Sequence, residues 1–390
     1  MLYTIPDYYK EFKCTADKCK DTCCAGWQIV VDEKSLAKYK KVCASHLLPI
    51  GKNADKDTSK FAWKVFRSID WNGGTFRQDE NKRCAFLDEN NLCDMYKNLG
   101  EKSLCKTCKL YPRHIEEFEG LREISLSVSC PEVAKILMEK KEPVKFLTYE
   151  KEGEEEFEDF DPFLFSILED ARKEMLKILQ NRNLPIRERT LLVLGMAHDM
   201  QVRINRQEMF ACSEVIEKYT RESALEYVQE FLTDSMLLAQ KRVALNKELF
   251  EKLSELELLR EEWNEVLHET EAYLFSNGAS GYERVCNEFS NWKENHSDVE
   301  IHLEQILVYF LFTYFPGAVY DGEVYAKVQM SVYCAWMIEN LWMARWLRNR
   351  KRLEFEEMTE LLYRFSREVE HSDENLKQVE KWMEKKWFLK

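Results

Sequence analysis

Beyond residue 160, apolar side chains recur every three to four positions, the spacing of one face of an α-helix. The last stretch of this region, residues 324–347, is rich in Trp, Tyr and Met, and we expect its aromatic side chains to lie in a core. Glycine and proline interrupt the pattern at 183–185, 278–281 and 316–317, where we expect breaks. The predicted helices are 163–180, 187–205, 213–260, 263–275 and 298–315.

The first 140 residues show a different pattern, in which short β-type runs alternate with loops. The β-branched and aromatic runs are 27–31 and 61–66, and residues 121–128 alternate in part. From Pro131 the spacing becomes helical, with proline at a favoured first position. The sequence therefore predicts a mainly α protein: an N-terminal cysteine-rich module with a few short strands and loops, followed by a large all-helical region.

An acidic segment separates these two regions. Residues 150–161 hold eight acidic side chains in twelve positions, which is typical of a solvated linker, and recognition of a basic substrate is the alternative. We therefore predict three parts: a metal- or iron–sulfur-binding module over 1–149, an acidic linker over 150–161 and an α-helical domain over 162–390.

The charge is unevenly distributed between the two ends of the chain. Residues 1–130 hold 22 Lys and Arg against 19 Asp and Glu, whereas the remainder holds 35 against 51. This balance argues against nucleic acid as a partner, because Lys and Arg supply most of the affinity for phosphates. An acidic surface suits basic or lysine-bearing protein partners, although it also serves solubility.

The chain shows neither a membrane span nor a secretory leader. No uninterrupted apolar stretch reaches the ~18 residues of a spanning helix. The opening MLYTIPDYYKEFKC has no basic segment followed by an apolar one. We therefore expect a cytoplasmic protein with no membrane partner.

Ten of the thirteen cysteines fall within the first 130 residues. Disulfides are the least attractive explanation, because cysteine runs in a long leaderless chain more often bind metal or do redox chemistry. Zinc usually takes two Cys-x2-Cys pairs, and only Cys105 and Cys108 form one. Iron–sulfur clusters accept irregular spacing. A radical-type Cys-x3-Cys-x2-Cys loop beginning at Cys19 is excluded, because residue 26 is glycine.

Four ordered strings around these cysteines resemble the flagellin lysine-N-methylases, the FliB family. They are CTADKCKDTCCAGWQIVVD (14–32), CAFLDENNLCDMY (84–96), TCKLYPR (107–113) and SLSVSCPEVAKILM (125–138). The N-terminal part is also similar to YkgJ-type zinc/iron-chelating domains. The resemblance implies a bacterial enzyme that methylates lysine ε-amines of flagellin, its protein partner. It also implies S-adenosylmethionine as the methyl donor and a cysteine-bound [4Fe-4S] cluster.

The resemblance carries over to eight thiols, more than the four that one cluster needs. Cys19, Cys23, Cys93 and Cys108 are the ligands we favour, and the other matching thiols are Cys14, Cys24, Cys84 and Cys130. Either some of the eight are packing residues or a second metal site exists. Cys105 is an extra relative to the family pattern, and the isolated Cys43, Cys212, Cys286 and Cys334 are expected to be small buried hydrophobes.

The residues themselves do not identify a binding site for S-adenosylmethionine. No G-x-G-x-x-G loop and no βαβ alternation is present, so a dinucleotide-type fold is not supported. Lysine must lose a proton before it can attack, and a Tyr or a carboxylate in an aromatic channel could accept it. We name no catalytic residue. The alternative function is a non-catalytic metal-chelating or electron-transfer module fused to a helical protein-binding domain.

Overall fold

The computed structural model describes residues 1–47, 56–233 and 235–385, and within these ranges the chain is mainly helical, as predicted. Packing divides the chain into two units. The helical unit comprises residues 1–12, 115–129 and 133–390, and the cysteine unit comprises 13–114 and 130–132. These limits form a different partition from the predicted parts 1–149, 150–161 and 162–390, whose functional roles stay predictions.

A small mixed sheet anchors the N-terminus in the helical unit. Strand β1 (Leu2–Pro6) pairs parallel with β5 (Leu121–Leu126) and antiparallel with β6 (Phe146–Glu150). With β4 (Arg113–Phe118) at the edge, the strand order is β4-β5-β1-β6. The strand expected within 121–128 is confirmed. Because the first residues of the chain pair with strands more than a hundred residues away, they fold together with the helices.

The acidic segment packs along this sheet. The Glu156 amide donates to the Glu117 carboxylate (3.0 Å), and Arg122 donates to the Glu154 carbonyl (2.9 Å). The Asp161 carboxylate then accepts a hydrogen bond from the amide of Phe163 (2.8 Å) and caps the next helix, α6 (Pro162–Leu179). Residues 151–161 therefore belong to the helical unit and lead directly into its first long helix.

The helices occur largely where the apolar spacing predicted them. The long predicted segment 213–260 is the main exception, because its described residues form three helices and not one, with a turn at Thr220–Arg221 between the first two. None of the described helices is long and apolar enough to cross a membrane. The helices of this unit are α5 (Pro131–Glu139), α6 (Pro162–Leu179), α7 (Ile186–Asn205), α8 (Cys212–Tyr219), α9 (Glu222–Thr233), α10 (Ser235–Leu253), α11 (Glu262–Leu274), α12 (Gly278–Glu294), α13 (Asp298–Tyr314), α14 (Ala318–Asp321), α15 (Val324–Arg348), α16 (Phe355–Glu370) and α17 (Asp373–Met383).

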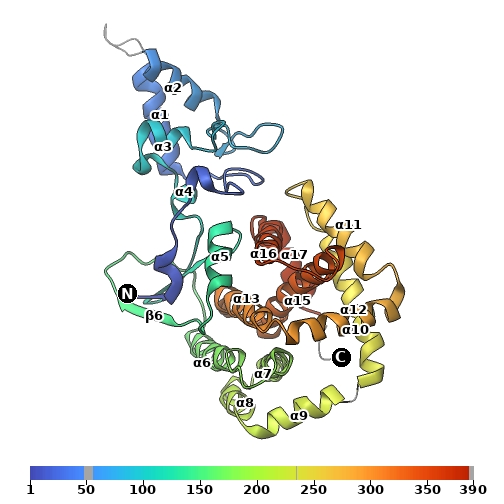
Figure 1. Cartoon of the computed structure of the whole chain (residues 1–390). Helices are drawn as coiled ribbons and strands as arrows, with labels where there is room; N and C mark the ends of the chain where they lie inside the picture. Colours follow the sequence, from blue (N-terminus) through green and yellow to red (C-terminus); the bar gives the residue numbers. More distant parts are fainter. Residues whose placement is uncertain (48–55, 234, 386–390) are drawn as a thin grey trace. The chain divides into compact units, whose positions relative to one another are not determined.

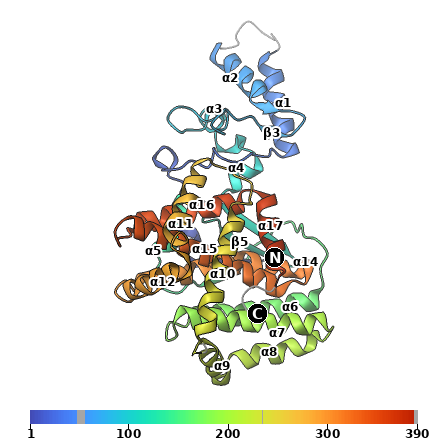
Figure 2. The same ribbon diagram turned by 90° about the vertical axis from the view of Figure 1, so that its right-hand side faces the viewer.

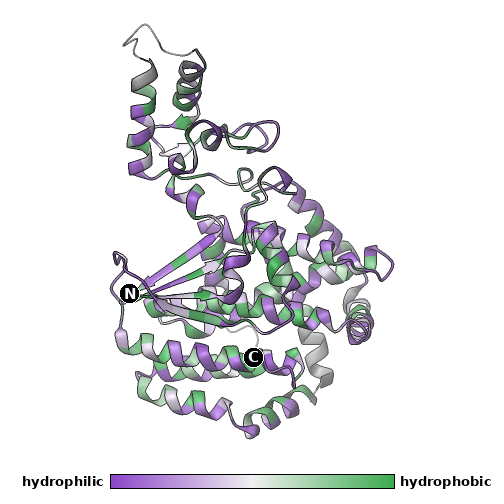
Figure 3. Cartoon of the chain, turned by 60° about the vertical axis from the view of Figure 1, so that its left-hand side comes forward, coloured by the Kyte–Doolittle hydropathy of each residue, from purple (hydrophilic) through white to green (hydrophobic). Residues whose placement is uncertain are grey.

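Helix α15 forms the centre of the helical unit. It contacts α7, α11, α13, α16 and α17, and α6, α7 and α8 lie side by side (Figures 1 and 2). Trp342 and Trp346 are buried, as expected for the aromatic stretch 324–347. Hydrophobic and hydrophilic residues are mixed along most of the helices (Figure 3). Helix α16 is of this kind, whereas α13 and α15 are mostly hydrophobic. A helix buried nearly all round is what a central position requires.

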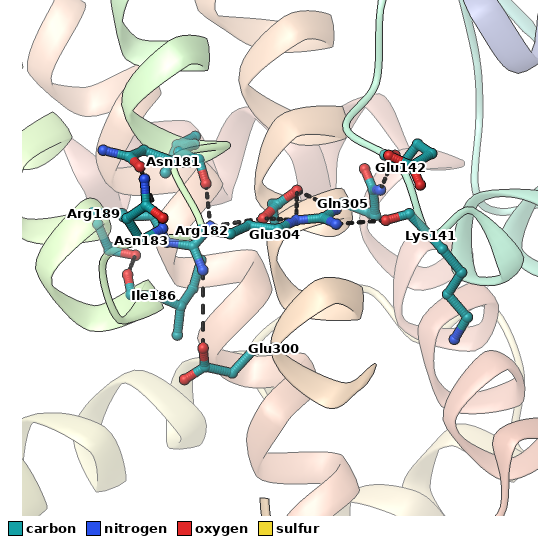
Figure 4. A network of polar contacts seen from close by, with 12 residues as sticks. Lys141, Glu142, Asn181, Arg182, Asn183, Ile186, Arg189, Glu300, Glu304 and Gln305 are labelled. Carbon is teal, nitrogen blue, oxygen red and sulfur yellow. Dashed lines mark hydrogen bonds and ion pairs between the residues drawn. The ribbon is translucent and has the colours of Figure 1, made fainter. Parts of the chain in front are cut away.

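A buried ion network fixes α13 to the neighbouring helices (Figure 4). The Glu304 carboxylate, on α13, accepts from Arg189 Nη1 on α7 (2.7 Å) and from Arg182 Nη2 in the α6–α7 loop (2.8 Å). Arg182 also donates to the Lys141 carbonyl (2.6 Å), and Gln305 donates to the Glu142 carbonyl (3.0 Å). The network joins three regions that are far apart in the sequence: residues 141–142, 182–189 and 304–305.

The cysteine unit has little regular structure. Its elements are η2 (Ala16–Lys18), α1 (Glu33–Leu47), α2 (Lys56–Arg67), β2 (Ile69–Asp70), β3 (Thr75–Phe76), α3 (Asp94–Leu99), η3 (Glu101–Ser103) and α4 (Lys106–Leu110).

Two of the predicted β-type runs are not strands. The run 61–66 is helical, because Ala62 and Val65 lie three positions apart on one buried helix face while Trp63 is half exposed. The run 27–31 makes only an isolated bridge, from Val30 to Thr75. β-branched and aromatic composition fits a half-buried surface of either kind, so it did not determine the backbone conformation.

Candidate functional site

Six cysteines pack in one hydrophobic core of the cysteine unit: Cys43, on α1, and five others. The loops bring these five together: the Cys84 amide donates to the Cys24 carbonyl (2.8 Å), and Cys93 forms an isolated bridge with Leu87. Cys93 and Cys105 are the N-caps of α3 and α4, and Cys108 lies within α4. We call this group the thiol core; it consists of Cys24, Cys84, Cys93, Cys105 and Cys108, packed with Phe76 and Phe86.

Hydrogen bonds between thiols set the electrostatics of the thiol core. Cys108 hydrogen-bonds Cys105, which raises the pKa of Cys108 and lowers that of Cys105. In the same way a hydrogen bond from Cys23 lowers the pKa of Cys24 to about 7, and the pKa of Cys23 rises. Burial raises the pKa of Cys84 to about 12. Each hydrogen bond therefore joins a thiol whose pKa is lowered to a thiol whose pKa is raised.

A second group of thiols surrounds Cys23. Cys14, Cys24 and Cys130 all act electrostatically on Cys23 and raise its pKa, after the hydrogen bond to Cys24 and burial. Cys130 belongs to the cysteine unit although it follows β5 in the sequence. Cys19 donates its thiol to the Asp21 carbonyl (3.1 Å), which leaves it outside both groups.

The structure thus brings some of the favoured residues together and separates others. Cys93 and Cys108 share the thiol core, whereas Cys23 lies in the second group and meets the core only through Cys24. Cys105, which the family pattern set aside, is fully buried in the core. The ligand assignments among the eight cysteines stay predictions. Cys43, Cys212 and Cys334 are buried, as expected for small hydrophobes, and Cys286 is partly exposed.

The thiol core has the donor atoms of a metal site. In residues 1–47, 56–233 and 235–385, no three or more His, Cys, Asp or Glu side chains are grouped closely enough to hold a metal ion. The chemistry of the thiol core nevertheless suits a soft metal or an iron–sulfur cluster, because its donors are sulfur atoms in an apolar surrounding. A cluster is larger than one ion, so it can be reached from several loops. The donor set therefore fits such a group in kind.

The sequence did not indicate one carboxylate of the helical unit, that of Glu370. Glu370, the last residue of α16, accepts Tyr309 OH (2.6 Å), Ser366 Oγ (2.7 Å) and Ser127 Oγ (3.1 Å), and Tyr314 hydrogen-bonds it as well. Glu370 and Ser127 are partly exposed, whereas Tyr309 is 2% exposed. No sequence motif marks this glutamate. Its partners come from the segment after β5, from α13 and from α16 itself, so only the fold assembles the site.

The similarity to a known protein family lies in the helical unit. The fold and the thiol core define a mainly helical protein with a cysteine-rich unit. Residues 172–389 match the family model described as the FliB lysine N-methylase C-terminal domain. This match covers more than half of the chain, which therefore belongs to the FliB family. The further likeness to YkgJ-type domains stays a prediction.

Curated relatives match over a shorter length. The lysine-N-methylase of Salmonella typhimurium (strain LT2) is 30% identical over 138 residues, which cover 33% of this chain and 31% of that protein. The lysine-N-methylase of Salmonella choleraesuis gives the same values. The flagellar biosynthetic protein FliU of Salmonella muenchen is 29% identical over 138 residues, or 73% of its length. The matched part thus spans about a third of the two methylases. No solved structure matches the chain.

Proposed function

We propose that the protein is a lysine N-methyltransferase that moves a methyl group from S-adenosylmethionine to lysine ε-amines of flagellin. The observation that carries this proposal is the match of residues 172–389 to the FliB lysine N-methylase C-terminal domain. The printed names of the relatives, lysine-N-methylase and flagellar biosynthetic protein, support the reaction and the flagellar substrate.

The reaction places modest demands on the protein. A lysine ε-amine has a pKa near 10.4, so it is protonated at neutral pH and must lose a proton before it can attack a methyl carbon. A binding site must then hold the amine in line with the donor and exclude water. The sheet β4-β5-β1-β6 is mixed, so the donor would not bind on a doubly wound parallel sheet.

We also propose that the thiol core holds an iron–sulfur cluster. Cys24, Cys84, Cys93 and Cys108 would be its ligands, since all four carry over from the family pattern and lie in one core. When bound, such a cluster ties these loops together and provides a redox-active centre. Cys105 would remain the hydrogen-bond partner of Cys108.

The proposed function predicts two observations on one preparation. Protein purified without oxygen should be brown and contain iron and sulfide. Supplied with S-adenosylmethionine, it should raise the mass of flagellin by whole methyl groups. A colourless protein that contains only zinc would contradict the cluster. An intact cluster with unmodified flagellin would instead favour the non-catalytic metal-binding or electron-transfer module.

A further inference from the structure

The Glu370 carboxylate, at the end of α16, has no cationic partner among the described residues. Its hydrogen bonds come only from the hydroxyls of Ser127, Tyr309, Tyr314 and Ser366, and it forms no ion pair among the described residues. Glu370 is also the last residue of α16, where the helix dipole disfavours a negative charge and favours a positive one. Its position therefore suits a cation that the chain itself does not supply.

One acceptor position on this carboxylate can be vacated. A carboxylate has about four lone-pair sites. Tyr309, Tyr314 and Ser366 occupy three of them. Ser127 has a single hydroxyl hydrogen, and its Oγ lies 2.7 Å from Ser129 Oγ as well as 3.1 Å from Glu370 Oε2. When Ser127 donates to Ser129, the fourth site on Glu370 is open to another donor.

Arg367 and His371, near the end of α16, bond to Ser129 (2.8 and 2.9 Å). The other titratable groups around Glu370 are uncharged when protonated. They are Tyr309 and Tyr314 on α13, Cys334 on α15, and Tyr8 in η1 (Asp7–Glu11), which acts on Tyr309. Burial raises the pKa of each of these four groups, so all stay neutral near pH 7. Burial also raises the pKa of Glu370, which the four hydroxyls counteract. A carboxylate so placed can both attract a cation and take a proton from it.

We propose that Glu370, flanked by Tyr309 and Tyr314, binds the ε-ammonium of the substrate lysine and accepts its proton. The tyrosine rings would line the path of the alkyl stem, and the partly exposed Glu370 and Ser127 mark the side from which the lysine enters. This inference rests on the proposed lysine methylation and names its proton acceptor.

The proposed step balances as follows. The ε-ammonium transfers one proton to the Glu370 carboxylate, which gives a neutral amine and a carboxylic acid. The lone pair of the amine then forms the new N–C bond while the C–S bond of the sulfonium donor breaks, and its electron pair stays on sulfur as a neutral thioether. The product is a methylated ammonium ion, and Glu370 returns its proton to water.

The first test compares Glu370→Gln with Glu360→Gln. Glu360 lies on the same helix but pairs with Arg364 (2.9 Å) and is not among the groups that act on Glu370, so it is the matched control. Loss of a proton acceptor should lower kcat by about 100-fold or more. The residual rate should climb about tenfold per pH unit, because only spontaneously neutral lysine then reacts. Wild-type rate and pH profile in Glu370→Gln would overturn the proposal.

The second test measures binding without any methyl donor. Wild-type protein should bind Nα-acetyl-lysine amide at least tenfold more tightly than the norleucine analogue, and Glu370→Gln should lose this preference. Lysine-selective binding without methylation of flagellin would refute the proposed function but keep the cation site. Methylation that persists in Glu370→Gln, without lysine-selective binding, would refute the cation site but keep the function.

A third variant covers the case in which Glu370→Gln does not fold. Tyr309→Phe removes the shortest hydrogen bond to the carboxylate and leaves the ring in place. Because that bond stabilises the charged form, the pH below which lysine amide binding is lost should move upward. An unchanged pH dependence of binding in Tyr309→Phe would overturn the assignment of Glu370.

Discussion

Glu304 and Glu370 lie in the same helical unit but have opposite surroundings. Glu304 is fully buried and meets two arginines, whereas Glu370 is partly exposed and meets only hydroxyls. A buried charge with matched partners serves the fold, because removing one partner leaves the other uncompensated. A carboxylate without a cation leaves room for a ligand. The difference between structural and functional glutamates lies in their partners.

Glu304→Gln should therefore destabilise the protein strongly. The substitution leaves Arg189, whose side chain is 2% exposed, with the longer ion pair to Glu300 (3.9 Å), whose side chain is 42% exposed. We expect a loss of about 3–5 kcal/mol in the free energy of unfolding, measured by urea denaturation. Glu217→Gln breaks an exposed pair with Arg221 and should cost no more than about 1 kcal/mol. Equal effects of the two substitutions would contradict the structural role of the network.

His302 should make the fold sensitive to acid. Burial lowers its pKa to about 4, with Lys141 adding to the effect and Asp298 opposing it. The unfolded chain takes up a proton near pH 6.5 and the folded chain does not, so stability is complete above pH 6.5 and is lost as the pH falls toward 4. The loss is on the order of 3 kcal/mol.

His302→Leu should flatten the dependence of the unfolding free energy on pH between 6.5 and 4, as followed by denaturant titrations. The same substitution at the exposed His268 serves as the control. Parallel pH curves for wild type and His302→Leu would show that His302 does not contribute.

Single residues differ in how far the sequence reveals them. The cysteines could be singled out because ordered motifs surround them, but the sequence could not show that Cys105 joins Cys108 or that Cys19 stands apart. Glu370 could not be predicted at all, because its hydrogen-bond donors come from the segment after β5, from α13 and from α16 itself. Only tertiary packing creates that environment.

At the level of elements, long periodic segments were predicted better than short ones. Helix α15 repeats its pattern over many turns, so the period alone identifies it. The run 61–66 is too short to separate a helix from a strand, and it forms part of α2. The acidic segment shows a further limit: charge predicted solvation, but its backbone also bonds to Glu117 and Arg122.

Asp161 should matter more than the other acids of that segment, because it caps α6. Its carboxylate accepts from the amides of Phe163 and Leu164 (2.8 and 3.3 Å). Asp161→Ala should lower the unfolding free energy by about 1 kcal/mol, and Asp161→Asn should keep most of it, since asparagine also caps helices. Thermal denaturation of both variants measures this, and an equal loss in both would argue against the cap.

The thiol core should depend on its cysteines as a set. Cys93→Ser and Cys108→Ser should each lower the iron content of protein purified without oxygen, because each removes a proposed ligand. Cys43→Ser is the matched control: Cys43 packs in the same hydrophobic core, and its thiol donates to the Ala62 carbonyl (3.7 Å). Full iron content in Cys108→Ser would remove that residue from the ligand set.

At the level of the whole molecule, two kinds of evidence support the function. The family match covers residues 172–389 of the helical unit. Three of the four motif strings fall in the cysteine unit, while 125–138 lies mostly in the helical unit. The sequence could predict a mainly helical protein, because the helical period is a local property. It could not predict that the first strand and the acidic segment fold with the helices. Strand β1 pairs with β5 more than a hundred positions away, and the acidic segment bonds to Glu117 and Arg122 across 39 and 32 positions.

Isotope labelling is a direct test of whether the protein transfers methyl groups to lysine. Anaerobically purified protein is incubated with flagellin and S-adenosylmethionine that carries a trideuterated methyl group, and the flagellin is analysed by intact-mass and peptide mass spectrometry. We expect flagellin to gain mass in whole labelled methyl groups, located on lysine residues. Flagellin whose mass stays unchanged, incubated with folded protein that contains its full iron, would contradict the proposed methyl transfer.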